Sequence, residues 1–255
     1  MNRVQLWSCG GGRQSAGIAA LIVEEKLPRP DHVAMVALEH EIRTTWPYVN
    51  HYIRPALAAL SIPFSVVARR DYATKGFFGG LDGKSVLLPV WSNQSGEPSK
   101  LPEYCSGEWK RDVLPRWAAE QDGWKQCGVD AWIGISWNER ERRRGPRRQW
   151  FQAVYPLLDM RPTDLSGCLA AVERVGWPEP PRSRCVFCPN QSDQEWLELS
   201  ADELAFAIKL EDEIRAVDTN AFFHRKMIPL RDVTFEAKKN GDSLFTGGCS
   251  AGMCF

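Results

Sequence analysis

The most constraining feature of this sequence is a strand, a glycine turn and a helix in immediate succession near its start. Residues 4–8 form a short apolar run typical of a buried strand, and residues 14–26 carry apolar side chains at helical spacing. Between them stands CGGGR. Glycines in this position let backbone N–H groups approach a phosphate, with the helix N-terminus adding partial positive charge. The turn is neither a G-x-G-x-x-G fingerprint nor a Walker loop, so a turn used only for close packing is an equally good interpretation.

The same alternation of strand and helix continues through the first two thirds of the chain. The patterns predict further strands over 32–38, 63–68 and 130–136, and helices over 46–60 and 106–121. Strands that alternate with helices form a parallel sheet with right-handed crossovers. We therefore predict an α/β fold, a three-layer sandwich around a parallel sheet of about five strands.

The domain organisation follows from where this rhythm breaks. We expect one α/β domain over 1–160, with a Gly-, Ser- and Pro-rich insertion at about 70–104 that is a candidate lid. Residues 161–255 are expected to form a helical, cysteine-bearing region with a mobile, Gly-rich tail. Ser200 and Glu203 predict a capping box at the start of one of its helices.

The composition places the chain in the cytoplasm. The N-terminus does not resemble a signal peptide, and no apolar stretch reaches the roughly 18 residues of a membrane span. Eight cysteines in a reducing compartment are poor candidates for a disulfide framework, so some of them are expected to be ligands or nucleophiles. The net charge of zero excludes neither nucleic acid nor any other anionic partner, because a local patch suffices.

Two polar segments follow predicted strands. The first, ALEHEIRTTW at 37–46, is acidic and bears threonines. The second, GISWNERERR at 134–143, opens a run that holds six arginines in the nine residues from Arg140. Only Glu141 balances this run in sequence, and arginine suits phosphate, so we favour an anionic substrate over a merely solvated face.

The cysteines have the spacing of a metal centre. Cys105 precedes Cys185 by eighty residues, and Cys188 completes a C-x-x-C followed by proline. Such a turn brings two thiolates to one metal, and a distant third joins through the fold. The spacing leaves iron–sulfur and zinc both open.

These motifs, in this order, resemble the adenine nucleotide alpha hydrolase (PP-loop) superfamily, which includes phosphoadenosine phosphosulfate (PAPS) reductases and ATP-dependent thiolation enzymes. SCGGGRQS resembles its S-G-G-x-D-S pyrophosphate loop, with Gln14 in place of the aspartate. Segments at 164–189 and 222–230 are similar to a phage and prophage branch. The resemblance implies nucleotide binding by Ser8, Gly10, Gly11, Gly12, Gln14, Ser15, Glu39, Glu41, Thr45, Gly134, Ser136, Asn138, Glu139 and Arg142.

The resemblance also implies roles for the cysteines. Cys105, Cys185 and Cys188 correspond to ligands of a [4Fe–4S] cluster, with Cys168, a tail cysteine or no residue as the fourth. Cys249 and Cys254, in a Gly-rich tail like that of the reductases, are candidates for the nucleophile or the missing ligand. Cys9 and Cys127 are expected to be structural.

The function implied is ATP-dependent sulfur transfer, in which an acceptor is adenylated and a sulfur then displaces AMP. The acceptor would be an anionic substrate such as DNA or tRNA, with Mg²⁺ as a possible further cofactor and a cysteine desulfurase as a possible sulfur donor. The alternatives are a PAPS or APS reductase that releases sulfite, and a zinc-stabilised nucleotide- or nucleic-acid-binding protein without turnover.

Overall fold

The computed structural model describes residues 2–79, 85–94, 96–145 and 148–236. These residues form two compact units. Residues 2–73 and 109–183 make up unit 1, and residues 74–108 and 184–236 make up unit 2. Each unit is therefore assembled from segments that lie far apart in the chain.

Unit 1 contains a five-stranded parallel sheet. Its strands are β1 (Val4–Ser8), β2 (His32–Ala37), β3 (Phe64–Ala68), β8 (Val129–Ile133) and β9 (Phe151–Val154), in the order β3-β2-β1-β8-β9. The predicted parallel sheet and its number of strands are confirmed. The chain builds outward from β1 to β3 and then crosses to the other side of β1, so the sheet has a switch point between β1 and β8.

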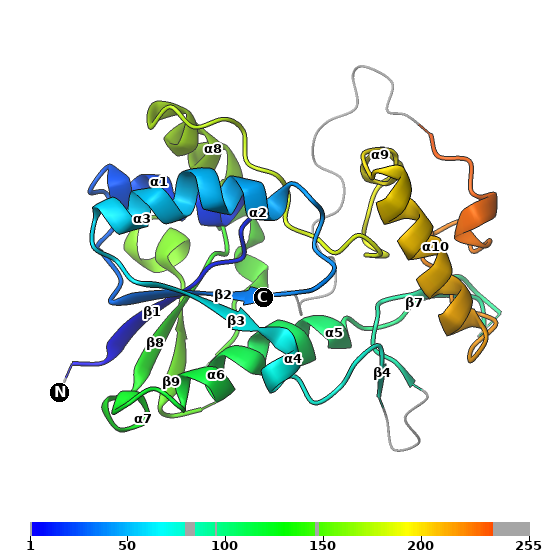
Figure 1. The fold of residues 1–255 in the computed structure, drawn as a ribbon, viewed down its shortest axis with the longest axis horizontal. Helices are drawn as coiled ribbons and strands as arrows, with labels where there is room; N and C mark the ends of the chain where they lie inside the picture. Colours follow the sequence, from blue (N-terminus) through cyan, green and yellow to red (C-terminus); the bar gives the residue numbers. More distant parts are fainter. Residues whose placement is uncertain (1, 80–84, 95, 146–147, 237–255) are drawn as a thin grey trace. The chain divides into compact units, whose positions relative to one another are not determined.

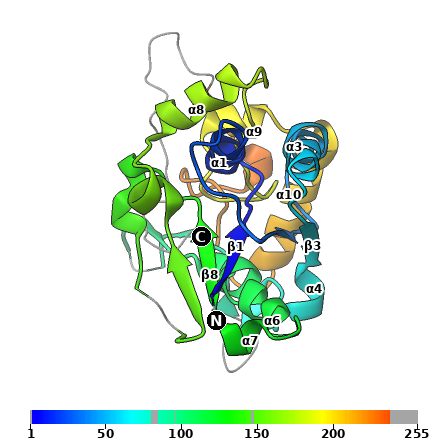
Figure 2. The ribbon, with the colours of Figure 1, turned by 90° about the vertical axis from the view of Figure 1, so that its left-hand side faces the viewer.

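Helices cover both faces of this sheet (Figure 1). One face carries α1 (Arg13–Val23), α3 (Arg54–Ala59) and α8 (Leu165–Arg174), and the other carries α4 (Arg69–Tyr72), α6 (Val113–Ala118) and α7 (Trp124–Cys127). Figure 2, turned by 90°, shows the same three layers. Apolar side chains from β1, β2, α1 and α8 form the main core, as α/β folds require.

Two details differ from the sequence-based expectation for the helices. Val23 was expected on the inner face of α1 but is 37% exposed at its last turn. The helix over 46–60, in which Pro55 predicts a bend, is divided into α2 (Thr45–Tyr48), a π-helical turn η1 (Val49–Ile53) and α3, whose start lies beside Pro55. The missing N–H and the ring of this proline disturb the regular hydrogen-bond ladder of the preceding turn.

The closest packing in unit 1 joins α1 to α8. Gly17 faces Cys168, and a Cβ on Gly17 would lie 2.5 Å from the Cβ of Cys168. The close approach of α1 to α8 explains why a glycine occupies the middle of a helix in which alanine would be intrinsically favoured.

Two further short helical elements, η3 (Trp137–Arg142) and η4 (Pro156–Met160), flank β9 in the chain.

Unit 2 combines most of the insertion with the last third of the chain. The insertion forms two small antiparallel pairs, β4 (Phe78–Gly79) with β5 (Ser85–Val86) and β6 (Trp91–Ser92) with β7 (Ser99–Lys100), followed by α5 (Tyr104–Ser106) and η2 (Gly107–Arg111), which runs on into unit 1. The later part contributes α9 (Asp193–Leu197), α10 (Ala201–Arg215) and η5 (Leu230–Asp232). Both α9 and α10 begin with a capping box, and the one predicted at Ser200 and Glu203 is confirmed.

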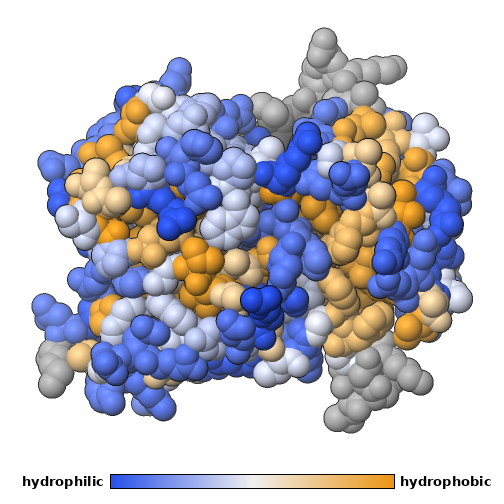
Figure 3. All heavy atoms as spheres, in the orientation of Figure 1, coloured by the Kyte–Doolittle hydropathy of each residue, from blue (hydrophilic) through white to orange (hydrophobic). Residues whose placement is uncertain are grey.

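Apolar side chains are exposed on part of unit 2. On the face drawn in Figure 3 they gather over α9 and the adjoining part of α10, and Leu197 at the end of α9 is 48% exposed. Within the described residues no helix is long and apolar enough to cross a membrane.

Candidate functional site

The sheet topology of unit 1 indicates where a ligand would bind. In open α/β sheets, ligands bind outside the carboxyl ends of the strands at the switch point. Here that point lies between the end of β1 at Ser8 and the end of β8 at Ile133, which are paired in register. The two segments that leave these strands are the glycine turn and residues 134–142, so the fold brings together two motifs that are more than a hundred residues apart.

The glycine turn is tightly constrained. The N–H of Cys9 donates to the carbonyl of Ala34 at 2.9 Å, and the N–H of Gly10 donates to Oγ of Ser15 at 2.8 Å. Gly11 has φ of +70°, and a Cβ there would lie 2.8 Å from Cγ2 of Thr45. The turn therefore has a specific shape that requires glycine at Gly11.

The turn leads directly into the N-terminus of α1. Gly12 is the N-cap residue, no side chain caps the helix, and its first turn contains no acidic residue. A Cβ on Gly12 would lie 3.0 Å from the backbone nitrogen of Ser183, so the chain before unit 2 passes close to this end of α1. The arrangement leaves the helix N-terminus without a side-chain acceptor, and its N–H groups and dipole favour an anion.

A polar network links the turn to the segment after β8. Gln14 Nε2 donates to Glu139 Oε2 at 2.7 Å, and Arg142 Nη1 donates to Glu139 Oε1 at 2.6 Å. The fully buried Ser136 donates its hydroxyl to Asn138 Oδ1 at 2.8 Å and lies 3.3 Å from Glu139 Oε2. The carboxylate of Glu139 is thus hydrogen-bonded to Gln14, which stands where the PP-loop motif S-G-G-x-D-S has its aspartate.

Gly134 belongs to the same junction. A Cβ at Gly134 would lie 3.4 Å from the Cβ of Gln14 and 3.4 Å from Cδ1 of Ile18. The two segments are therefore in van der Waals contact as well as hydrogen-bonded.

The three candidates of the acidic segment have different surroundings. Glu39 accepts a hydrogen bond from Nε of Arg69 at 2.8 Å. Burial alone would raise the pKa of Glu39, but its own backbone N–H and the Arg69 guanidinium together lower it. Glu39 is thus an ionised carboxylate already engaged in an ion pair.

Glu41 and Thr45 instead have polar atoms that are not satisfied. Burial raises the pKa of Glu41 to about 7, against smaller opposing effects of Lys110 and of the Trp46 side chain. Within the described structure, Oε2 of Glu41 and Oγ1 of the fully buried Thr45 have no hydrogen-bond partner, and neither has Oγ of Ser183. Buried polar atoms are nearly always paired, so those of Thr45, which contacts Gly11, and of Ser183, which contacts Gly12, favour a bound water or ligand at this place.

The arginine run is more neutralised than its sequence indicates. Arg142 pairs with Glu139, and Arg143 Nη1 lies 2.7 Å from Oδ1 of Asp159. The expectation that Glu141 alone balances the run is wrong, because the fold brings in acidic residues from elsewhere. Arg140 lies over the ring of Trp137, which is 46% exposed.

The three cysteines of the predicted metal centre all belong to unit 2. Cys185 and Cys188 stand on one turn, closed by a hydrogen bond from the N–H of Cys188 to the carbonyl of Cys185 at 3.1 Å. Burial raises the pKa of the Cys105 thiol, and the charges of Cys188 and Cys185 raise it further. Three thiolates are the donor set that an iron–sulfur cluster or zinc requires.

The three cysteine thiols have the chemistry that a metal centre needs, but they are not arranged around a common metal position. In the part of the chain that the structure describes, no group of three or more His, Cys, Asp or Glu side chains is arranged to hold a metal ion. Metal binding would therefore draw the three thiols together, as commonly happens when a metal centre and its local fold form jointly.

The remaining cysteines differ in their surroundings, and Cys127, at the end of α7, is half-buried. Cys9 is 3% exposed and belongs to the core, as expected, and burial raises its pKa to about 11. Cys168, the candidate fourth ligand, is fully buried between α1 and α8 in the core of unit 1, and burial raises its pKa to about 12. Its thiol has a packing role there. Cys249 and Cys254 lie outside the described residues.

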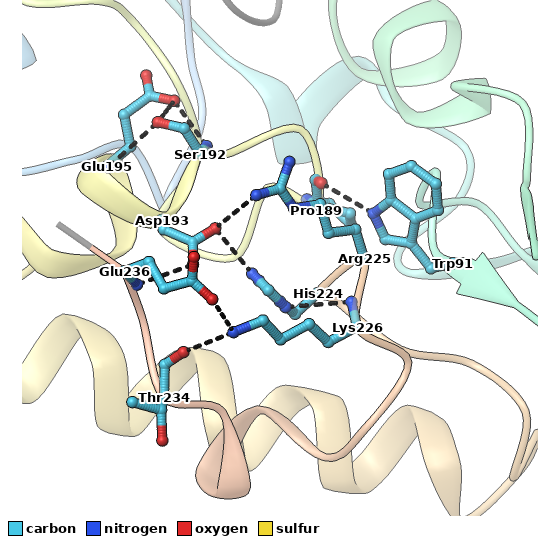
Figure 4. A network of polar contacts seen from close by, with 10 residues as sticks. All are labelled: Trp91, Pro189, Ser192, Asp193, Glu195, His224, Arg225, Lys226, Thr234 and Glu236. Atoms are coloured by element: carbon cyan, nitrogen blue, oxygen red, sulfur yellow. Dashed lines mark hydrogen bonds and ion pairs between the residues drawn. The ribbon is translucent and has the colours of Figure 1, made fainter. Parts of the chain in front are cut away.

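A network next to the cysteine turn holds the end of the described chain (Figure 4). The buried Asp193 accepts hydrogen bonds from Nε2 of His224 at 3.2 Å and from the N–H of Glu236 at 2.9 Å. Nδ1 of His224 accepts from the N–H of Lys226, and burial lowers the His224 pKa, so the imidazole is neutral. The segment that leads to the tail is thereby attached to the start of α9.

Sequence reasoning missed Ser183. Its only signal was its position two residues before the C-x-x-C motif, and nothing in the pattern shows that the preceding segment reaches α1. In the structure the hydroxyl of Tyr48 donates to the carbonyl of Pro178 at 3.0 Å and Arg13 pairs with Glu179 at 3.1 Å. These contacts hold the segment that carries Ser183 beside the glycine turn.

The fold and the site define an α/β protein with a candidate phosphate-binding turn at the switch point of its sheet. No family model matches the chain, and no curated protein matches it. One solved structure that aligns with it is the U34-tRNA thiolase NcsA from Methanococcus maripaludis with its [4Fe-4S] cluster; the alignment covers 98% of this chain and 77% of that chain, at 14% identity and a TM-score of 0.46. A likeness of this degree does not assign a function, so the function is argued from this chain's own residues.

Proposed function

We propose that unit 1 binds ATP and that the chain is an ATP-using sulfur-transfer enzyme of the PP-loop type. The observation that carries the proposal is the N-terminus of α1, which no side chain among the described residues caps, with unpaired buried oxygens on Thr45 and Ser183, the residues that approach Gly11 and Gly12. An anionic ligand with several acceptor oxygens, such as a pyrophosphate, would accept from the helix N–H groups and from the two hydroxyls. Glu41, protonated at its raised pKa, would donate as well.

Each part of the site has a task in adenylation. An oxygen of the acceptor attacks the α-phosphorus of ATP, the bond to the β-phosphate oxygen breaks, and pyrophosphate leaves. The α1 N-terminus stabilises the charge of the leaving pyrophosphate, and Arg142, held by Glu139, is within the same network. Glu139, accepting from Gln14, provides the carboxylate nearest the turn at which Mg²⁺ would bind.

The thiols of unit 2 would supply the second step. Cys105, Cys185 and Cys188 would hold the metal centre, and Cys168 is left out of the set because it is packed in the core of unit 1. A cluster bound by three thiolates would leave one iron without a protein ligand, where a sulfide for transfer could bind. The centre held by these three thiols would supply the sulfur that replaces AMP on the adenylated carbon of the acceptor, and AMP would leave with the bonding electron pair. The acceptor class we propose is a nucleic-acid base.

The first test concerns the nucleotide. Equilibrium binding of ATP is measured for the wild-type chain, for Ser15→Ala and for Ser166→Ala, the same change at an exposed position of α8. Loss of the Ser15 hydroxyl frees the Gly10 N–H and loosens the turn, so we expect affinity to fall about tenfold, while Ser166→Ala binds as the wild type does. Unchanged binding by Ser15→Ala would place the nucleotide elsewhere.

The second test concerns the reaction and the metal. Chain purified without oxygen is assayed for iron, sulfide and zinc, and for pyrophosphate release from ATP with tRNA or DNA. We expect iron and sulfide to be lost in Cys185→Ser and Cys188→Ser and retained in Cys127→Ser. Stoichiometric zinc without turnover would favour the binding protein, and sulfite release from PAPS would favour the reductase.

A further inference from the structure

The insertion of unit 2 makes direct contact with the cysteine turn. Trp91 on β6 donates its indole N–H to the carbonyl of Pro189, the residue after Cys188, at 3.3 Å (Figure 4). Lys100 on β7 places its ammonium 5.8 Å from the centre of the Trp91 ring. The insertion therefore supports the turn through a hairpin, a role that the expectation of a lid did not include.

A buried polar group ties the two cysteine segments together. Glu103 is 1% exposed, and its Oε1 accepts a hydrogen bond from Nδ2 of Asn190 at 2.6 Å. Nζ of Lys100 lies 3.8 Å from the same carboxylate oxygen and also donates to Oδ1 of Asn190. Within this set of three side chains, the buried carboxylate of Glu103 receives both a hydrogen bond and a counter-charge.

Two residues of this set, Glu103 and Asn190, lie close in sequence to cysteines of the predicted metal centre. Glu103 stands two residues before Cys105, and Asn190 stands two residues after Cys188. The hydrogen bond between them joins segments that are 87 residues apart. Because only two residues of backbone separate each bonded side chain from its cysteine, this bond restricts the relative position of Cys105 and Cys188.

The turn itself is held separately on its other side. Gln191 Nε2 donates to the carbonyl of Val186 at 3.0 Å, and the buried Arg184 donates from Nε to Gln191 Oε1 at 2.8 Å and from Nη2 to the carbonyl of Glu195 at 3.1 Å. These bonds shape the turn and attach it to α9. Cys105 is held on its own side by a hydrogen bond from its N–H to the carbonyl of Leu87 at 2.9 Å, and the Glu103–Asn190 bond joins its segment to the turn.

We propose that Glu103, Asn190 and Lys100 form a positioning set that holds Cys105 against the Cys185–Cys188 turn. The proposal rests on the proposed function, because a three-thiolate metal centre is what such a set would serve. None of the three side chains is proposed as a metal ligand. Their role is to keep the third thiol in place before metal binding, which lowers the entropy cost of closing the centre.

The experiment uses the polarity of the Glu103–Asn190 bond. Asn190→Asp keeps the size of the side chain but sets a second carboxylate against Glu103. The double variant Glu103→Gln with Asn190→Asp restores one donor and one acceptor, with their direction reversed, and keeps one negative charge for Lys100. Asn93→Asp makes the same chemical change at an exposed position in the connection between β6 and β7.

The readout is disulfide formation in the full chain without metal. Diamide accepts two electrons and two protons as two thiols become a disulfide, and peptide mapping quantifies the bond between Cys105 and either cysteine of the turn. We expect Asn190→Asp to slow this bond about tenfold, as for the loss of one charge-assisted buried hydrogen bond, and the double variant to return to within about threefold of wild type. Asn93→Asp should react at the wild-type rate.

Three results would overturn the proposal: Asn190→Asp reacting as fast as wild type, the double variant remaining as slow as the single one, or Asn93→Asp reacting as slowly as Asn190→Asp. Rescue by the double variant cannot come from a chain that has merely lost its fold. Iron content, measured on the same variants, should follow the same order. A wild-type chain that holds neither iron nor zinc would refute the metal centre, whereas the disulfide assay tests the positioning set independently of metal.

Discussion

The replacement of Gly11 by alanine is the sharpest test of the glycine turn. Two costs follow from the structure. Alanine at φ of +70° pays roughly 1–2 kcal/mol for the left-handed conformation. Its Cβ would also lie 2.8 Å from Cγ2 of Thr45 and 3.2 Å from Cγ2 of Val49, both on stiff β-branched side chains of a helix.

The second cost has the size of an overpacked core. Such substitutions typically cost about 1–3 kcal/mol, because neighbouring side chains must leave their preferred positions. Met35 Cε, 2.9 Å from the new Cβ, is the end of a flexible side chain and can move. The two costs together predict a loss of roughly 2–5 kcal/mol in the free energy of unfolding.

The assay is urea unfolding followed by circular dichroism, with Gly10→Ala as the matched control. Gly10 does not have a positive φ, and a Cβ there would meet only Oγ of Ser15 at an ordinary 3.7 Å. We expect the control to unfold close to the wild-type midpoint and Gly11→Ala well below it. Equal midpoints for Gly11→Ala and Gly10→Ala would refute the claim that the turn requires glycine at this position.

Three further predictions follow from buried groups of unit 1. Gly17→Ala should lower the free energy of unfolding by about 1–3 kcal/mol, because the new Cβ meets both the Cβ and the backbone of Cys168. This loss outweighs the gain in helix propensity of about 1 kcal/mol. If the variant were more stable than wild type in urea, α1 and α8 would not be packed this closely. Cys168→Ser should leave the iron content of anaerobically purified chain unchanged, and loss of iron in a folded variant would show that this thiol is a ligand after all. The pKa of Glu41 is raised from 4.5 to about 7 in the folded chain. Between these two pH values the folded state binds more protons than the unfolded state. The stability that comes from protonated Glu41 is therefore fully present below pH 4.5 and is lost as the pH rises through 7. Glu41→Gln should therefore be more stable than wild type at pH 8 by up to roughly 3 kcal/mol, with the difference shrinking toward pH 5, and a difference that does not change with pH would show that Glu41 titrates normally.

Most of the sheet was predictable because its signals are local. The apolar runs of β1, β2, β3 and β8 are bounded by glycine, proline and charged residues, and their alternation with helices leaves a parallel sheet as the consistent arrangement. The short strand β9 was not predicted as a separate element, since only four residues pair there. The capping box at Ser200 was predictable for the same reason as the strands, because its two partners are three residues apart.

The candidate site was predictable only in part. The glycine turn and the segment after β8 could be named from their place after strands, but the bond from Gln14 to Glu139 spans 125 residues. Local patterns hold no information on such pairs. The balance of the arginine run by Asp159 and the burial of Cys168 were missed for the same reason, since both depend on which elements pack together.

The sequence alone determined the strands, the turn that needs glycine, and the donor chemistry of a C-x-x-C motif with a third cysteine, because each of these depends on neighbours along the chain. Only the tertiary structure decided which cysteines come together, that Glu103 and Asn190 join their segments, and that Thr45 and Ser183 keep unpaired oxygens beside the turn. Burial and pairing depend on contacts between distant segments, and the free energy of a buried polar atom is set by whatever the fold places next to it.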